Sequence, residues 1–341
     1  MSVMLGVMPR STRRTLVGAA APVRHVVGTH QPVMLNELLE LLAPAPGEVV
    51  VDATLGAGGV SAAFLNRVLP GGRVLALDRD PSAVSSARHR FAAYGEAFTA
   101  EEASFSELER IAGKHQVLAD IVVLDLGISS LQLDDPRRGF SFLVEGPLDM
   151  RMGPSRQTLT AADIVASYSE AELADLFFEL GEERQSRPIA RAIVARRQKA
   201  PIRTTTQLAE ICAQAVPRRF WPKRIHPATR VFLALRVAVN DELGELERGL
   251  AAATQILRPD GRIGTLSFQP SEHRLTKHSL NVLAKDCVCP SHQMVCTCAH
   301  RATLSLVTRR SVKPTSEEVT RNPRARSAQL RVAVRLPTPG P

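Results

Sequence analysis

Short runs of apolar residues that end on a carboxylate recur along the first third of the chain. Three such runs each lead into an acidic residue: 49–51 into Asp52, 74–77 into Asp78 and 121–124 into Asp125. Uninterrupted apolar runs rich in Val, Ile and Leu are typical of parallel strands that are covered on both faces. Further strand patterns bring the expected total to seven, with a poorly defined third strand before Ser104 and later strands at 262–268, 302–307 and 330–336. The pattern therefore predicts an α/β fold.

A glycine-rich turn follows the first run. Gly56, Gly58 and Gly59 precede a predicted helix at residues 61–69, and glycine lets the backbone approach a ligand closely. Asp78 follows roughly twenty residues later, where an acidic residue typically accepts from two ribose hydroxyls. The unit fits NAD or S-adenosylmethionine, or a tight turn without a ligand, although the third glycine comes early for the dinucleotide pattern.

The ends of three predicted strands carry the candidate chemistry. Ligands of open α/β sheets bind at the carboxyl ends of the strands. Asp52, Asp78 and Asp125 are therefore expected to gather along one edge of the sheet. This arrangement favours a ligand site over a turn that only connects a strand to a helix.

Helical periodicity dominates the middle of the chain. Between residues 160 and 225 no strand pattern occurs, and four helices are predicted: 161–166, 170–180, 189–197 and 206–215. One long helix over residues 229–257 is expected to lead back to the sheet. We therefore expect a disordered basic extension at residues 1–28 and a sheet domain in two parts, at residues 29–155 and 226–341. An all-helical insertion at residues 156–225 is expected between the two parts.

The net charge of +9 is concentrated in one segment. Residues 184–236 hold thirteen Lys or Arg and one acid, Glu210, so the rest of the chain is slightly acidic. A basic block of this kind suggests a polyanionic partner, while a solvated helical surface is the alternative.

Targeting signals are weak. Residues 1–36 carry four arginines and no acid, which suits either a transit peptide or a basic extension. No apolar run is long enough to span a membrane, so no membrane partner is expected. We expect a cytoplasmic protein, with the mitochondrial matrix as the alternative, and the sequence leaves a homodimer open.

Four of the five cysteines form two C-x-C pairs in a Cys-rich loop at residues 287–300: Cys287 with Cys289 and Cys296 with Cys298. Four thiols can hold a tetrahedral zinc ion. Zinc motifs typically have C-x2-C spacing, however, and a C-x-C pair strains a chelate to a single ion. Zinc and redox-labile thiols remain alternatives, the thiols are not expected to be catalytic, and no metal ligand is assigned.

Several motifs in a fixed order resemble the ribosomal RNA small-subunit methyltransferase H family, also called MraW. They extend from residue 30 nearly to the C-terminus: DATLGAGG (52–59), DRDP (78–81), DLGISS and QLD (125–134), RGFSF (138–142), GPLDMRM (146–152), GEER (181–184), HPATR (226–230) and NPRARS (322–327). So many ordered motifs make the resemblance highly specific.

The resemblance implies a Rossmann-like, seven-stranded class I methyltransferase sheet with an inserted helical domain. It also implies methyl transfer from S-adenosylmethionine to N4 of a cytosine in the decoding region of small-subunit rRNA. Carried over by position, the cofactor contacts are Gly58, Gly59, Val60, Asp78, Phe105, Asp125 and Gln132.

The chemistry of three of these residues agrees with such a cofactor. Asp78 suits the ribose hydroxyls, Phe105 the adenine ring, and Asp125 the adenine amino edge or the methionine end. An acceptor near N4 would orient the amine and help to remove its proton, and Asp125 and Asp149 are the candidates. The target cytosine must also be unstacked to enter a pocket.

The chain departs from the family pattern at two places. The family usually has His after the two glycines, where this chain has Val60, so a side-chain contact is lost while a backbone contact remains. The family also has SFHSLEDR where this chain has SFQPSEHR at residues 267–274. These departures motivate a second hypothesis, an rRNA-binding assembly factor with weakened catalysis. An NAD-dependent enzyme is the third and is disfavoured by the glycine spacing.

Overall fold

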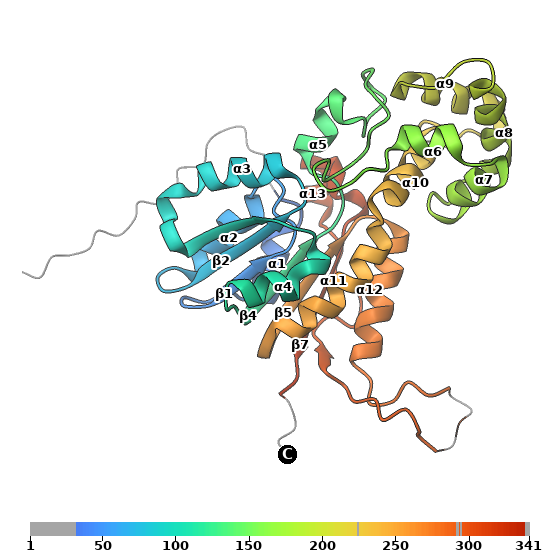
Figure 1. The fold of residues 1–341 in the computed structure, drawn as a ribbon. Coiled ribbons are helices and arrows are strands. Elements are labelled where there is room, and N and C mark those ends of the chain that lie inside the picture. Colours follow the sequence, from blue (N-terminus) through green and yellow to red (C-terminus); the bar gives the residue numbers. More distant parts are fainter. Residues whose placement is uncertain (1–31, 224, 291–292, 294, 338–341) are drawn as a thin grey trace, which may run out of the picture.

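A mixed β-sheet lies at the centre of the structure (Figure 1). The computed structural model describes residues 32–223, 225–290, 293 and 295–337. The strands in this part of the chain are β1 (Val49–Asp52), β2 (Arg73–Asp78), β3 (Phe98–Glu102), β4 (Ala119–Asp125), β5 (Leu257–Ser267), β6 (Leu304–Leu306) and β7 (Gln329–Arg335). Their order is β3-β2-β1-β4-β5-β7-β6, and β7 runs antiparallel to both neighbours. The predicted α/β fold with a seven-stranded sheet is confirmed.

Different helices cover the two faces of the sheet. On β1, Val50 faces one hydrophobic cluster, while Val49 and Val51 face the other, because side chains alternate along a strand. The helices on the first face are α1 (Leu35–Leu42), α2 (Gly59–Val68) and α3 (Pro81–Arg90). Those on the second are α4 (Leu108–Lys114), α11 (Glu242–Ile256) and α12 (Pro270–Leu283). Burial on both faces explains why the strand runs are apolar throughout.

A group of helices packs beside the sheet and has its own core (Figure 1). Its helices, together called the helical unit, are α6 (Ala161–Ser167), α7 (Glu170–Glu179), α8 (Ser186–Arg197), α9 (Thr205–Ala215) and α10 (Thr229–Asn240). Leu148 and Met150 enter this core from the preceding loop, and Phe232 and Leu235 enter it from α10. The hydrophobic core of the helical unit thus also includes residues that flank the expected insertion at residues 156–225 on both sides.

The expected single helix at residues 229–257 is wrong. The chain turns at Asp241, the single residue between the end of α10 and the start of α11. Its φ of 47° lies in the left-handed region, which interrupts the helix. Asp tolerates this conformation better than most residues. The break lets α10 bury Leu235 in the helical unit, while α11 buries Leu246 and Leu250 against the sheet.

Two further helices, α5 (Ser130–Asp134) and α13 (Ser316–Arg321), lie near the carboxyl edge of the sheet (Figure 1). The predicted extension at residues 1–28 lies outside the described residues. None of the helices described combines the length and the apolar character that crossing a membrane requires.

Candidate active site

A cavity of about 470 Å³ opens at the carboxyl edge of the sheet. Its wall includes Asp78 and Asp125 at the ends of β2 and β4, and the first turn of α2. Residues of α10 and α11 close another side, so the cavity lies where the sheet meets the helical unit. This is the edge at which open α/β sheets bind ligands, and the volume suits a small molecule.

Most of the residues predicted to contact a cofactor reach this cavity: Gly59, Val60, Asp78, Phe105, Asp125 and Gln132. Gly58 is not among the described residues that line it. Gly58 precedes α2 with φ of 75°, and a Cβ atom at that position would lie 2.8 Å from the ring of Phe91. Gly58 therefore permits the turn and its packing, while Gly59 and Val60 face the cavity.

Asp78 is held by backbone donors. The N–H of Gly56 donates to Oδ2 at 2.8 Å, and the N–H of Asp80 donates to Oδ1 at 2.9 Å. Each oxygen keeps a second lone pair that can accept from a ligand hydroxyl. Burial raises the pKa of Asp78 to about 6, although these hydrogen bonds oppose the rise. The geometry fits a pair of ribose hydroxyls.

Asp125 carries a buried acceptor that lacks a partner among the described residues. Its Oδ1 makes no hydrogen bond. Burial raises the pKa of Asp125 to about 8, and the charges of Asp52 and Glu272 add to the rise. A buried polar atom without a partner is costly, so a ligand that brings an N–H donor or a positive charge would relieve this cost.

Glu272, which the sequence reasoning did not single out, lines the same cavity. Its Oε2 accepts from the backbone N–H groups of Phe268 and Gln269 at 2.9 and 3.1 Å, an arrangement that caps α12. Burial raises the pKa of Glu272 to about 7, with Glu242 adding to the rise. The Ser/Thr/Gln-x-x-Glu pattern before a helix was the available sequence signal. His273 is not among the described lining residues.

Arg236 corrects one expectation about the basic block. It lines the cavity and forms a two-pronged ion pair with Glu242, through Nε at 2.7 Å and Nη2 at 2.8 Å. Its side chain is 12% exposed, so it belongs to the interior of the site rather than to an RNA-facing surface. The sequence could not show this, because the pair forms across the break at Asp241.

Asp149 is placed differently from Asp125. Its carboxylate accepts from Nε and Nη2 of Arg151 at 2.9 and 2.7 Å, and it does not occur among the described lining residues. Burial acts to raise the pKa of Asp149, but the hydrogen bonds from Arg151 outweigh it and lower the pKa. A carboxylate so engaged is a weak proton acceptor, and we do not propose Asp149 as one.

Asp52 lies below the glycine turn rather than in the described cavity wall. Its Oδ2 accepts from Oγ of Ser61 at 2.6 Å, and Oδ1 accepts from the N–H of Thr54 at 3.2 Å. These bonds join the end of β1 to the start of α2. Asp52 therefore shapes the turn, and its charge helps to raise the pKa values of Asp125 and Asp78 in the cavity wall.

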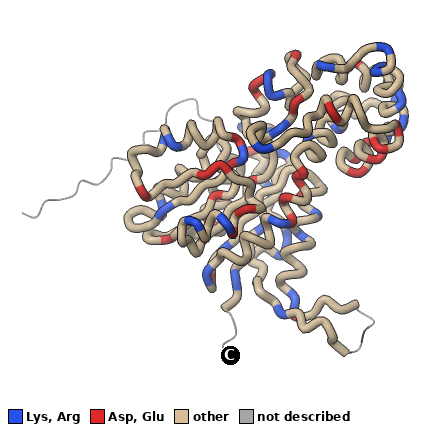
Figure 2. Tube along the Cα trace, viewed as in Figure 1, with Lys and Arg blue, Asp and Glu red and all other residues tan. Residues whose placement is uncertain are grey.

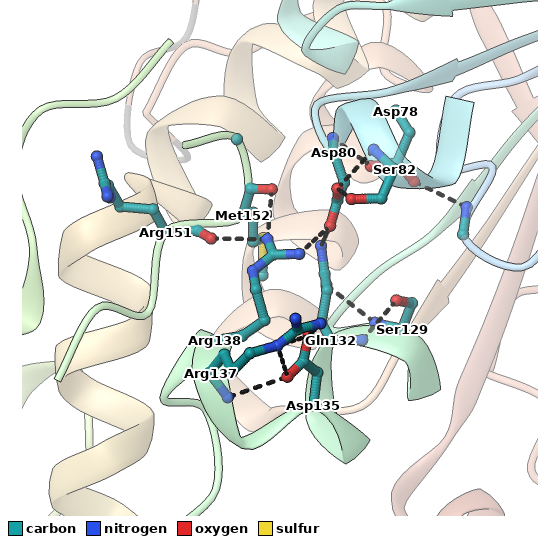
Figure 3. Close-up of polar contacts among 12 residues, drawn as sticks. Asp78, Asp80, Ser82, Ser129, Gln132, Asp135, Arg137, Arg138, Arg151 and Met152 are labelled. Carbon is teal, nitrogen blue, oxygen red and sulfur yellow. Dashed lines mark hydrogen bonds and ion pairs between the residues drawn. The ribbon is translucent and has the colours of Figure 1, made fainter. Parts of the chain in front are cut away.

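A buried ion pair fixes the loop that follows β4 (Figure 3). Nη1 of Arg138 donates to Oδ2 of Asp80 at 2.6 Å, and Nε2 of Gln132 donates to the same oxygen at 3.1 Å. Nη2 of Arg138 also donates to the carbonyl oxygens of Arg151 and Met152, both at 3.0 Å. Gln132, which was expected to contact a cofactor, lines the cavity, and its amide also takes part in this network, so the side chain helps to position the cavity wall.

Phe105 lines the cavity and packs on α11. A Cβ atom added to Gly249 would lie 2.4 Å from the Phe105 ring. Gly249 therefore makes room for the ring, which leaves another part of Phe105 facing the cavity. The ring can serve as a stacking surface for a planar base, as the sequence suggested.

Positive charge runs along the outer helices of the helical unit (Figure 2). Within the described part of residues 184–236, the exposed cations are Arg184, Arg187, Arg191, Lys199, Arg203, Arg218, Arg219 and Lys223. Arg196 and Arg197 are only partly exposed and donate to the carbonyl oxygens of Ala200 and Val165. The basic surface is thus smaller than the basic block in the sequence.

The strand order, with an antiparallel β7 between β5 and β6, and the ligand edge with Asp78 agree with a Rossmann-like methyltransferase, and the family match given next identifies the protein as an S-adenosylmethionine-dependent methyltransferase. The model of the MraW methylase family matches residues 28–336, and the chain belongs to this family.

Two relatives illustrate the similarity. The chain is 46% identical to ribosomal RNA small subunit methyltransferase H of Anaeromyxobacter sp. (strain K), over 90% of this chain and 98% of that protein. It is 48% identical to the protein of the same name from Thermomicrobium roseum, over 90% of this chain and 94% of that one. A SAM-dependent O-methyltransferase structure from Thermotoga maritima is more distant, with TM-score 0.41 and 11% identity over 92% of this chain and 70% of that chain.

The residues of the cavity fit S-adenosylmethionine. Acidic side chains outnumber basic ones in the wall, with Asp78, Asp125, Glu242, Glu245 and Glu272 against Arg79, Arg236 and Arg324. An acidic cavity favours a ligand that carries a sulfonium and an ammonium group. Asp78 would hold the ribose, Phe105 would face the adenine, and the free Oδ1 of Asp125 would accept from a donor on the cofactor or the substrate.

Proposed function

We propose that this protein methylates the N4 amino group of a cytosine in the decoding region of small-subunit rRNA. The names of the similar proteins support rRNA of the small subunit as the substrate. The observation that carries the proposed chemistry is the buried Oδ1 of Asp125 at the cavity wall, which has no hydrogen-bond partner among the described residues. An exocyclic amine needs an acceptor of this kind, because its lone pair is delocalised into the ring.

Bound S-adenosylmethionine would supply a methyl group on a sulfonium, which is already activated for transfer. The protein then contributes mainly position and proton acceptance. Oδ1 of Asp125 would accept a hydrogen bond from an N–H of the amine and so orient the amine. The pKa of Asp125, about 8, and that of Glu272, about 7, lie near neutral pH, where proton acceptors are effective.

The departures from the family pattern leave this apparatus in place. Val60 lines the cavity as an apolar side chain in the first turn of α2, which begins at Gly59. Gln269 stands where the family usually has His, and its Nε2 donates to Oε1 of Glu272 at 3.0 Å. The Glu that the family shares is Glu272, which remains in the cavity wall. These observations favour an active enzyme over a weakened assembly factor.

Substrate RNA would be held by the exposed cations of the helical unit. Phosphate contacts of this kind position a nucleic acid without reading its sequence. Arg218 also stacks 3.9 Å from the centre of the Trp221 ring, which forms a cationic and aromatic surface beside the block. The proposed setting is the cytoplasm, where the small subunit of a bacterial cell matures, with the mitochondrial matrix as the alternative.

The direct test uses labelled S-adenosylmethionine and small subunits that lack the modification. We expect label in small-subunit rRNA, and nucleoside mass spectrometry should identify N4-methylcytidine. The Asp125→Asn variant should lose most of this transfer. Asp175→Asn is the control, because Asp175 is exposed on α7 outside the cavity. Label at another atom would contradict the N4 assignment, and cofactor binding without label transfer would favour the assembly factor.

A further inference from the structure

The Cys-rich loop connects α12 to β6 and projects away from the helical unit (Figure 1). It is closed at its base, where the N–H of Thr303 donates to the carbonyl of Leu283 at 2.8 Å and Nε2 of His300 donates to that of Val282 at 3.0 Å. The described apolar residues of the loop, Val288 and Val295, are 44% and 73% exposed. The loop therefore has little hydrophobic core to stabilise its conformation.

Four thiols nevertheless meet at one point of this loop. The Sγ atoms of Cys287, Cys289, Cys296 and Cys298 all lie within 4.8 Å of one another. Cys298 Sγ is 3.6 Å from that of Cys296 and 3.8 Å from that of Cys287. A tetrahedral zinc ion with Zn–S bonds of about 2.3 Å separates its sulfur ligands by about 3.8 Å. The separations of 3.6 and 3.8 Å match this geometry, and the remaining ones do not exceed 4.8 Å.

The sequence spacing alone had argued against a single ion, because a C-x-C pair makes a strained chelate. The structure answers that objection, since the sulfurs of the Cys296 and Cys298 pair lie 3.6 Å apart, close to the tetrahedral separation, and Cys298 also lies 3.8 Å from Cys287 of the other pair. The backbone also donates to the sulfurs: the N–H of Val288 to Cys298 at 3.5 Å and the N–H of Cys289 to Cys287 at 3.4 Å.

The separations do not fit disulfides. A disulfide joins its sulfur atoms at about 2 Å, whereas these sulfurs are nearly twice as far apart. All four cysteines are free in the structure. Oxygen and nitrogen ligands are absent from the cluster among the described residues, and an all-thiolate set favours zinc over magnesium or calcium.

We propose that Cys287, Cys289, Cys296 and Cys298 bind one structural zinc ion that stabilises the loop. Four protein ligands leave no open position, so the ion is structural rather than catalytic. α12 separates the cavity from the proposed zinc site. Gln269 and Glu272 at the start of α12 lie in the cavity wall, and the helix ends before the loop, about 20 Å away at 1.5 Å per residue. The sequence left zinc and redox-labile thiols as alternatives, and this proposal chooses zinc.

The test measures metal directly. Protein purified without chelators should contain about one zinc ion per chain by mass spectrometry, and the Cys289→Ser/Cys298→Ser variant should contain almost none. Cys212→Ala is the matched control, because Cys212 is buried in the core of the helical unit and should leave the zinc content unchanged. Cobalt added to metal-free protein should give the visible absorption of a tetrahedral thiolate site.

A second measurement guards against misfolding of the cysteine variant. Its affinity for S-adenosylmethionine should equal that of the wild type, while protease should cleave its loop faster. Zinc far below one per chain, with no cobalt spectrum, would refute the site. Iron with a coloured chromophore would refute zinc as the metal. Fewer than five free thiols in denatured, metal-free protein would indicate disulfides instead.

Discussion

At the scale of single residues, the site is organised by carboxyl groups whose pKa values burial has raised. Asp78, Asp125 and Glu272 line one cavity, and their pKa values are about 6, 8 and 7. Such groups are expensive to bury as anions. The binding of a cationic cofactor would recover part of this cost, so the residues that bind the ligand are also residues that destabilise the free protein.

We predict that Asp78→Ala weakens the binding of S-adenosylmethionine by about 1–3 kcal/mol, because ribose hydroxyls lose a charged acceptor. Isothermal titration calorimetry measures the change. Asp175→Asn serves as the control, since Asp175 is exposed on α7. An unchanged affinity in Asp78→Ala would remove this carboxylate from the cofactor site.

Asp125 predicts a pH dependence of stability. Its pKa is raised to about 8 in the folded protein, against about 3.9 in the unfolded chain. The carboxyl group of Asp125 therefore binds its proton more tightly in the folded state than in the unfolded chain. Its contribution to the free energy of unfolding is fully present below about pH 4 and is lost as the pH rises through about 8. Asp125→Asn should be more stable than the wild type at about pH 8, with the difference shrinking towards about pH 4. Urea unfolding measures both proteins across this pH range. A difference in stability that stays constant with pH would contradict the prediction.

At the scale of elements, the loop after β4 is a rigid part of the cavity wall because of Asp80. Its carboxylate is 3% exposed and accepts from Arg138, Gln132 and the Ser82 hydroxyl. Burial alone would raise the pKa of Asp80, but these hydrogen bonds hold the pKa below its usual value. Arg138 also reaches the carbonyl groups of residues 151 and 152, so one ion pair joins the start of α3 to the loop whose Met152 packs in the core of the helical unit.

We predict that Arg138→Ala lowers the free energy of unfolding by about 3 kcal/mol, because it leaves a buried carboxylate without its cation. The neighbouring residue gives the control. Arg137 is 88% exposed and pairs with Asp135 at the surface, so Arg137→Ala should change stability by less than about 0.5 kcal/mol. Urea unfolding compares the two variants. Equal losses would show that the Asp80 pair is not the source of the stability.

At the scale of the whole molecule, two surfaces of different charge serve two ligands. The cavity at the edge of the sheet has an acidic excess, whereas the outer helices of the helical unit carry the exposed cations (Figure 2). This division would keep the polyanionic RNA on the basic surface of the helical unit and the cationic cofactor in the acidic cavity. The α10–α11 connection at Asp241 joins the two parts and supplies Arg236 and Glu242 to the cavity.

Charge reversal separates these roles. Arg187 and Arg203 are exposed in the helical unit, so Arg187→Glu/Arg203→Glu should raise the apparent KM for small subunits and flatten its dependence on salt, because fewer counterions are released. The cofactor affinity should not change. Arg67→Glu/Arg73→Glu is the matched control, since these exposed residues lie at the end of α2 and the start of β2, at the opposite edge of the sheet. Equal effects of the two variants across a salt titration would mean that the basic surface has no specific role.

The sequence by itself determined the parts of this protein that depend on local pattern. The apolar runs specified both-face burial, and the residues that follow them placed Asp78 and Asp125 at the ligand edge. The helical periodicity located α6 to α9 within a few residues of their observed bounds. These features are local because strand and helix periods are properties of neighbouring residues.

Only the tertiary structure decided which of these residues act together. The same Arg-rich segment holds Arg187 at the surface and Arg236 inside the cavity, and the difference comes from Glu242 and Glu272, which pack there from α11 and α12. Asp149 and Asp125 looked alike as acceptors, yet Arg151 engages one and leaves the other free. Two C-x-C pairs became one cluster of sulfurs when the loop closed. Burial, pairing and convergence depend on neighbours that are distant along the chain, so no local pattern could determine them.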